Sequence, residues 1–173
     1  MFARAATASI KLHGGNSPFV ADIYNNLGVA HLNAMQVEQA EEYFSKAIKI
    51  YDTAHGPGSI HTIGVMANLA MIYGRQGKVE ESLQLNLKVL KAREIALGAV
   101  HEDVGKSLMN VGVQYMRLQQ YEEAVAYYEK ARDVFVKTVG KNHHNVGSVC
   151  YNAAMVQYNL KRYEDSARNY EQV

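Results

Sequence analysis

The sequence contains one cysteine, two prolines and almost no net charge. A single thiol, Cys150, excludes an internal disulfide framework and is typical of a reducing compartment, so we expect a cytoplasmic location. Two prolines in 173 residues, without a long polar tract, leave no candidate for an interdomain linker. The net charge of +1 argues against a nucleic-acid-binding arm and against an acidic disordered tail.

The chain also lacks a hydrophobic run long enough to cross a bilayer. A membrane-spanning helix needs about 18–20 apolar residues in succession, and no segment approaches that length, so we expect no membrane insertion. Hydrophobic residues nevertheless make up 48% of the chain and charged residues 20%. This composition predicts a folded chain with a packed core.

The sequence matches itself when it is shifted by 42 residues. Four segments align without a gap: "NLGVAHLN" from Asn26, "NLAMIYGR" from Asn68, "NVGVQYMR" from Asn110 and "NAAMVQYN" from Asn152. Small residues recur two places after each asparagine, at Gly28, Ala70, Gly112 and Ala154. A glycine closes each unit, at Gly14, Gly56, Gly98 and Gly140. Coincidences at a single spacing indicate a repeat architecture.

Each 42-residue unit is predicted to form two helices joined by a tight turn. Apolar residues recur at helical spacing, for example at Leu108, Val111 and Tyr115. The expected first helices cover roughly residues 20–34, 62–76, 104–118 and 146–160. The expected second helices cover residues 37–55, 79–97 and 121–139. The predicted fold is therefore all-α, an α-α superhelix (solenoid) of helical hairpins.

We expect residues 1–173 to form a single repeat array. The predicted parts are the second helix and exit turn of a partial repeat at 1–17, repeats at 18–59, 60–101 and 102–143, and a partial repeat at 144–173. Because the chain begins and ends inside repeats, we expect either a longer parent solenoid or a homo-oligomer formed through the end helices. Residues 1–21 contain basic residues and no acid, so a mitochondrial transit peptide is a minor alternative.

The arrangement of small and large residues resembles the tetratricopeptide repeat. An apolar–small pair stands in each first helix, at Leu27–Gly28, Leu69–Ala70, Val111–Gly112 and Ala153–Ala154. The usual period of this family is 34 residues, and the longer period found here resembles the kinesin light chain subclass. The resemblance implies stacked hairpins whose first helices line a concave groove, and a non-catalytic adaptor or scaffold role in protein binding.

The face of the first helices that carries the recurring asparagine mixes amides, apolar side chains and cations. An amide can pair with the backbone of any peptide, methionine adapts to varied apolar side chains, and arginine binds carboxylates bidentately. We therefore predict a site for an extended peptide, apolar with acidic residues. The predicted peptide-binding residues are Asn26, Val29, Asn68, Met71, Arg75, Lys106, Asn110, Val113, Arg117, Asn152 and Met155.

Three alternatives stay open, and the least favoured is that the chain is the regulatory array of an enzyme whose catalytic domain lies outside residues 1–173. The recurring asparagines can instead bond neighbouring helices and hold the repeats in register, while the cations form intramolecular ion pairs. The chain can also be a structural scaffold that assembles through its end helices or convex back, with no free peptide ligand.

Nothing in the sequence indicates catalysis, a cofactor or a metal. Nucleotide loops and nucleophile elbows are missing, so we expect no enzyme activity and no cofactor. His143 and His144 fall in an inter-repeat turn, as do His61 and His101, without a cysteine or carboxylate set at ligand spacing. Cys150 falls at a packing position. The twelve tyrosines are assigned to packing positions and form no stacking platform for nucleic acid, which is not expected as a partner.

Overall fold

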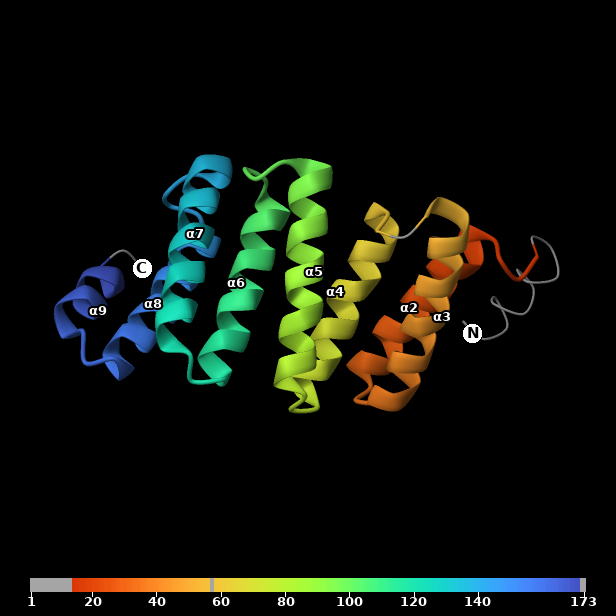
Figure 1. Ribbon diagram of the computed structural model, residues 1–173, viewed down its shortest axis with the longest axis horizontal. Coiled ribbons are helices and arrows are strands. Elements are labelled where there is room, and N and C mark those ends of the chain that lie inside the picture. The colour runs from red at the N-terminus through yellow and green to blue at the C-terminus, as the bar shows by residue number, and fades with distance from the viewer. Residues whose placement is uncertain (1–13, 57, 172–173) are drawn as a thin grey trace. The chain divides into compact units, whose positions relative to one another are not determined.

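The computed structural model describes residues 14–56 and 58–171, and every regular element in these residues is a helix (Figure 1). The helices are α2 (Pro18–Asn33), α3 (Val37–His55), α4 (Ile60–Arg75), α5 (Val79–Leu97), α6 (Glu102–Arg117), α7 (Tyr121–Val139), α8 (His144–Asn159) and α9 (Tyr163–Tyr170). The predicted all-α class is confirmed. The helix predicted within residues 1–17 lies almost wholly outside the described residues.

The helix bounds follow the 42-residue period. The predicted bounds of the three second helices coincide with those of α3, α5 and α7. Each first helix begins two residues before its predicted start and ends one residue before its predicted end. The early start has a local cause, because the N-cap residues precede the first apolar residue of each helix. These N-caps are Ser17, Ser59, His101 and His143.

The described residues form two compact units, which we call unit 1 (up to Lys78) and unit 2 (from Val79). In unit 1, α2 and α3 form a hairpin against which α4 packs. In unit 2, α6–α7 and α8–α9 are hairpins, α5 packs against α6, and α7 packs against α8. The division falls inside the predicted repeat at 60–101, and the predicted repeat boundaries stay a prediction.

Two of the hairpins, α2–α3 and α6–α7, close around a contact between a glycine and an aromatic ring. In unit 1 the ring of Phe44 lies against Gly28, where an added Cβ would come within 2.6 Å of the ring. In unit 2 Tyr128 lies in the same way against Gly112, with the Cβ at 2.7 Å. Both rings are fully buried. Because side chains do not tolerate such distances, the ring in the second helix requires glycine in the first.

The turn inside each hairpin requires a left-handed backbone conformation. Gly77 adopts it with φ 77°, but Met35, Gln119 and Lys161 occupy the same repeat position with φ of 61°, 60° and 60°. The residue after each of them closes the helix end, as where the Gln36 N–H donates to the His31 carbonyl at 2.9 Å. The non-glycine residues therefore carry backbone strain.

The assignment of all tyrosines to packing positions is wrong for four of them. Between 45% and 61% of each of these residues is exposed: Tyr151, Tyr158, Tyr163 and Tyr170. Their counterparts one repeat earlier are partly or fully buried: Met109, Met116, Tyr121 and Tyr128. The physical reason is coverage, because α8 packs against α7 of the preceding hairpin. Among the described residues no helix covers α8 and α9 in that way.

Glycine 112 provides a direct test of the hairpin contact. We expect Gly112→Ala to destabilise the protein by about 1–3 kcal/mol, because the new methyl group overpacks the Tyr128 ring. Gly64 is the matched control: it lies within α4 with no atom near its would-be Cβ. Gly64→Ala should instead stabilise by about 0.5–1 kcal/mol through helix propensity. Urea unfolding measures both, and equal effects would contradict the contact.

Glutamine 119 tests the strained turn. We expect Gln119→Gly to stabilise the protein by up to about 1 kcal/mol, because glycine adopts the left-handed conformation without a Cβ clash. The neighbouring Gln120 has φ −86° and makes no side-chain cap bond, so Gln120→Gly should bring no gain. The midpoints of chemical unfolding of the two variants decide the matter, and a loss of stability in Gln119→Gly would exclude the strain.

Candidate functional site

Five of the predicted peptide-binding residues lie in unit 1, on the neighbouring helices α2 and α4. Val29 and Met71 are the apolar members, and they are 36% and 44% exposed. Asn26 and Arg75 are also exposed, whereas Asn68 is half-buried. The structure therefore presents four of these five side chains to solvent.

Asn68 forms a side-chain hydrogen bond within unit 1. Its Nδ2 donates to the Oδ1 of Asn25 on α2 at 3.3 Å, which is the register-keeping bond that the sequence left as an alternative. The residues 43 places before Asn110 and Asn152 are Ala67 and Met109, whose side chains offer no oxygen. The same bond therefore cannot recur at these two asparagines.

The other six predicted residues lie in unit 2. Lys106, Asn110, Val113 and Arg117 are on α6, and Asn152 and Met155 are on α8. Asn110 and Arg117 are exposed, and Met155 is 39% exposed. Val113 is half-buried and packs against the core of unit 2, so it is the least available of the apolar members.

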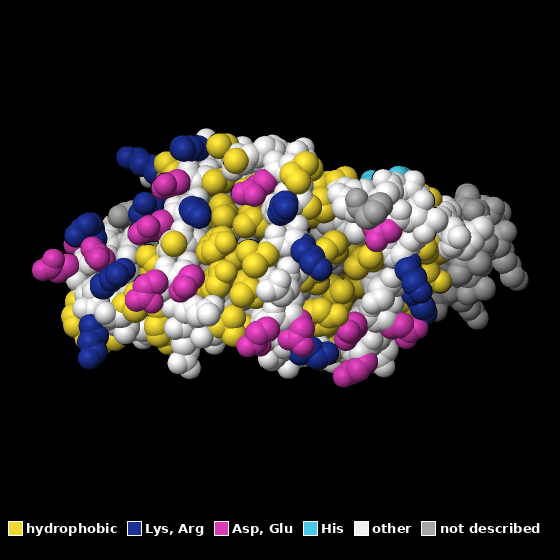
Figure 2. All heavy atoms as spheres, viewed as in Figure 1, with side chains coloured by type: hydrophobic (Ala, Val, Ile, Leu, Met, Phe, Trp, Pro, Cys, Tyr) yellow, Lys and Arg dark blue, Asp and Glu magenta, His cyan; other side chains and the backbone are white. Residues whose placement is uncertain are grey.

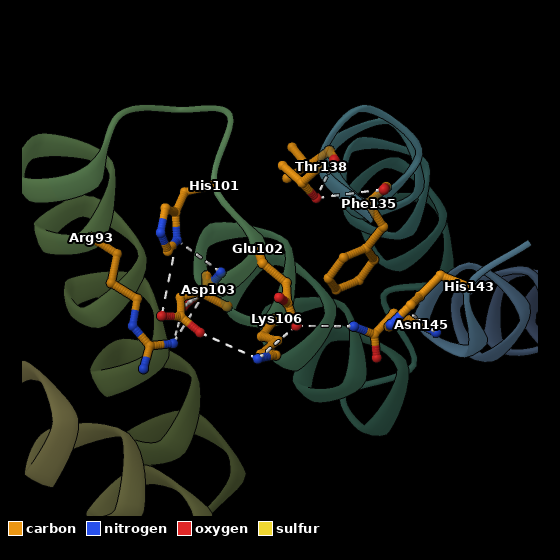
Figure 3. Close-up of polar contacts among 11 residues, drawn as sticks. Arg93, His101, Glu102, Asp103, Lys106, Phe135, Thr138, His143 and Asn145 are labelled. Atoms are coloured by element: carbon orange, nitrogen blue, oxygen red, sulfur yellow. Dashed lines mark hydrogen bonds and ion pairs between the residues drawn. The ribbon is translucent and has the colours of Figure 1, made fainter. Parts of the chain in front are cut away.

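Lys106 belongs to an ion-pair network at the start of α6 (Figure 3). Its Nζ lies 2.9 Å from Oε1 of Glu102 and 3.3 Å from Oδ1 of Asp103. The hydrogen bond between Lys106 and Glu102 raises the pKa of the lysine and lowers the pKa of the carboxyl. Glu102 also accepts from Nδ2 of Asn145 on α8 at 3.4 Å. Lys106 thus takes part in an intramolecular ion pair, and an acidic ligand would have to compete with it.

A cleft of about 480 Å³ lies beside Asn152. Its other lining residues, which were not among the predicted ones, are His144, Gly147, Ser148 and Tyr151. Spacing of three and four residues places them on the helix face of Asn152, and this signal could have found them. A second cleft of about 550 Å³ is lined by Arg132, Lys137 and Lys141, among others, and was also missed.

The histidines are placed differently from the prediction. His61 and His144 lie in the first turns of α4 and α8, and His101 and His143 are N-caps. The cause is the early start of the first helices. Within the described ranges no group of three or more metal-ligating side chains could hold a metal ion. Cys150 lies in the core as expected, and burial raises the pKa of its thiol.

Side chains of both charges are mixed on the face that Figure 2 shows. On the face where α5 and α7 lie in front, Figure 2 shows Lys and Arg side chains interspersed with Asp and Glu, without an extended area of one sign. No helix in the part of the chain that the structure describes is long and apolar enough to cross a membrane.

The fold agrees with a comparison to known families. A tetratricopeptide repeat model matches residues 19–95 and 103–173. The chain belongs to the tetratricopeptide repeat family. Its repeats make it a protein–protein interaction module, of a family whose members are typically non-catalytic.

Solved structures show the same stacked hairpins. BtubC (BKLC) from P. vanneervenii matches with a TM-score of 0.84 and 18% identity, over 90% of this chain and 63% of that one. The nearly identical repeats of a Podosopora anserina protein assigned as a kinesin light chain match with a TM-score of 0.84 and 19% identity, over 99% and 81%. Aspartyl phosphate phosphatase F from Bacillus subtilis matches with a TM-score of 0.82 and 17% identity, over 99% and 43%.

These matches confirm the α-α solenoid and the likeness to kinesin light chain repeats at the level of the fold. Sequence identities this low do not allow an activity or a partner of these proteins to be assigned to this chain. The chain spans 63% of the length of BtubC and less than half of the phosphatase. A search of curated proteins gave no match.

The two asparagines Asn68 and Asn110 should differ when they are truncated. We expect Asn68→Ala to cost about 0.5–1.5 kcal/mol, since it removes the bond to Asn25. Asn110→Ala should change the free energy of unfolding by less than about 0.5 kcal/mol, as an exposed substitution. Chemical denaturation measures both. A double-mutant cycle with Asn25→Ala should show coupling for Asn68 and none for Asn110, and equal coupling would refute the distinction.

Proposed function

We propose that the chain is an adaptor that binds an extended peptide, apolar with acidic residues, on the asparagine-bearing face of its first helices. The observation that carries this proposal is the exposure of the apolar row. Met71 and Met155 are 44% and 39% exposed, and Val29 is 36% exposed. Methionine is enriched in the centres of protein interfaces and adapts to varied partners.

A cation stands one helical turn from the apolar row in each unit. Arg75 follows Met71 by four residues, and Arg117 follows Val113 by four. Side chains four apart are neighbours on a helix surface. A ligand with an apolar side chain next to a carboxylate can therefore contact both groups, and a guanidinium can hold the carboxylate through two hydrogen bonds.

The remaining predicted residues differ in their exposure and in their hydrogen bonds within the chain. Asn110 and Asn26 are exposed amides that suit the backbone of an extended peptide. Lys106 is paired with Glu102 and Asp103, so an acidic ligand would have to compete with these carboxylates for its ammonium group. Asn68 contributes mainly to register through Asn25. A cytoplasmic location, proposed from the single buried thiol Cys150, fits such a module.

A second candidate is a scaffold that assembles through α8 and α9. It is favoured by the exposed tyrosines of these helices, because tyrosine is enriched in interfaces. In this case the chain would form a homo-oligomer whose mass falls on dilution, and light scattering over a concentration series distinguishes it from the adaptor.

Selection from a random-peptide display library tests the adaptor. We expect wild-type binders to share an apolar residue beside an acid, and their affinity to fall as salt screens the arginines. Arg117→Ala should weaken them about tenfold or more, as expected for a lost charged hydrogen bond. Arg117→Lys should restore only part of the affinity, because lysine cannot form the bidentate contact.

The matched control is Lys88→Ala, which removes an exposed cation from the second helix α5 of the same unit. It should leave binding unchanged. Melting curves of each variant separate lost binding from lost folding. Binders with no acidic residue, or an equal loss in the Lys88 and Arg117 variants, would exclude the proposed face.

A further inference from the structure

Histidine caps two helices of unit 2. His101 precedes α6 and His143 precedes α8. In each ring Nδ1 accepts a hydrogen bond from the backbone N–H two residues later, at 3.1 Å from Asp103 N and at 3.2 Å from Asn145 N (Figure 3). The imidazole therefore does what a serine or aspartate oxygen does at most N-caps.

The same repeat position carries serine in unit 1. Ser17 Oγ accepts from the Phe19 N–H at 3.3 Å, and Ser59 Oγ accepts from the Thr62 N–H at 3.3 Å. A hydroxyl keeps its lone pairs at every physiological pH. An imidazole nitrogen can accept only while it is unprotonated, and histidine is the side chain that ordinarily titrates between about pH 8 and 5.

We propose that protonation of His101 and His143 uncaps α6 and α8, so that unit 2 loosens in acid by a route that the caps of unit 1 lack. A protonated Nδ1 can no longer accept, which orphans the N–H of Asp103 and of Asn145. It also places a positive charge at the positive end of each helix dipole. The caps therefore contribute stability above the titration range and lose it as the pH falls.

Charged groups of α5 and α6 lie around His101. The Asp103 carboxylate lies 3.9 Å from Nδ1. Arg93 of α5 donates to the Asp103 carbonyl at 3.2 Å, and Lys106 pairs with the Asp103 carboxylate. From α7, Phe135 and Thr138 bring no charge to this end of α6. The Asp103 side chain is 42% exposed, so solvent screens its charge, whereas the cap hydrogen bond is lost outright when Nδ1 takes a proton.

Charged and aromatic groups also lie around His143. Glu102 of α6 interacts with it electrostatically. The ring centroid of His144 lies 4.2 Å from that of His143. Lys137 of α7 and Lys141 of the connecting turn add positive charge to this region. The first turn of α8 also holds Asn145, which bonds Glu102, so uncapping loosens the contact between the two hairpins.

The repeat itself supplies the matched variant, His101→Ser/His143→Ser, which gives unit 2 the caps of unit 1. Between about pH 7.5 and pH 5.5, we expect the melting temperature of the wild-type chain to fall by about 5 °C more than that of this variant. As a control, Ser17→Ala/Ser59→Ala should lower the melting temperature equally at both pH values. None of these measurements involves a ligand, so the result is independent of the proposed peptide binding.

A second measurement on the wild-type chain removes the dependence on variants. Long-range proton–nitrogen NMR reads the imidazole tautomer, and both rings should carry their proton on Nε2 at neutral pH. Amide hydrogen exchange should show that Asp103 and Asn145 lose protection about tenfold in acid. A proton on Nδ1, an equal pH dependence in wild type and serine variant, or a wild-type chain that resists acid better than the variant would each overturn the proposal.

Discussion

The contact between a bare glycine backbone and an aromatic ring sets the packing of two of the hairpins, α2–α3 and α6–α7, on which the rest of the structure builds. The ring can lie directly on the first helix only where no Cβ intervenes, so Gly28 and Gly112 set the distance between the helices of two hairpins. The contact also determines which face remains outside. A residue two positions earlier on a helix lies about 200° away around the helix axis. Asn110 is therefore exposed when Gly112 is buried. The candidate binding face is thus a consequence of how the hairpin closes.

Equivalent positions in the repeats do not have equivalent environments. Asn68 bonds Asn25, whereas the residues at the corresponding distance from Asn110 and Asn152 have no acceptor. Lys106 is paired with two carboxylates, although its position on the helix face would suit a ligand. Structural bonds therefore use part of the polar surface that the repeat provides. Only the remainder is available for a partner, which makes the surface side chains more informative than family membership about what binds.

The junctions between hairpins carry a different chemistry in the two units. Serine hydroxyls cap the first helices of unit 1, and imidazoles cap those of unit 2. Either group satisfies a backbone N–H at the helix start, so the fold accepts both. The two groups differ in their response to protons. Units with the same repeat architecture can therefore differ in their sensitivity to pH. The three solved structures described above share the hairpin stack with this chain at under 20% identity.

The sequence by itself determined the all-α class, the 42-residue period and the bounds of α3, α5 and α7, because these depend on local periodicity and on glycine at the helix ends. It also placed the asparagines, Met71 and Arg117 on one helix face, since spacing alone defines a face. It could not decide which of these side chains were available, nor that four tyrosines would be exposed and two histidines would cap helices. Those outcomes depend on which residues of other helices come within a few ångströms, and only tertiary packing sets these distances.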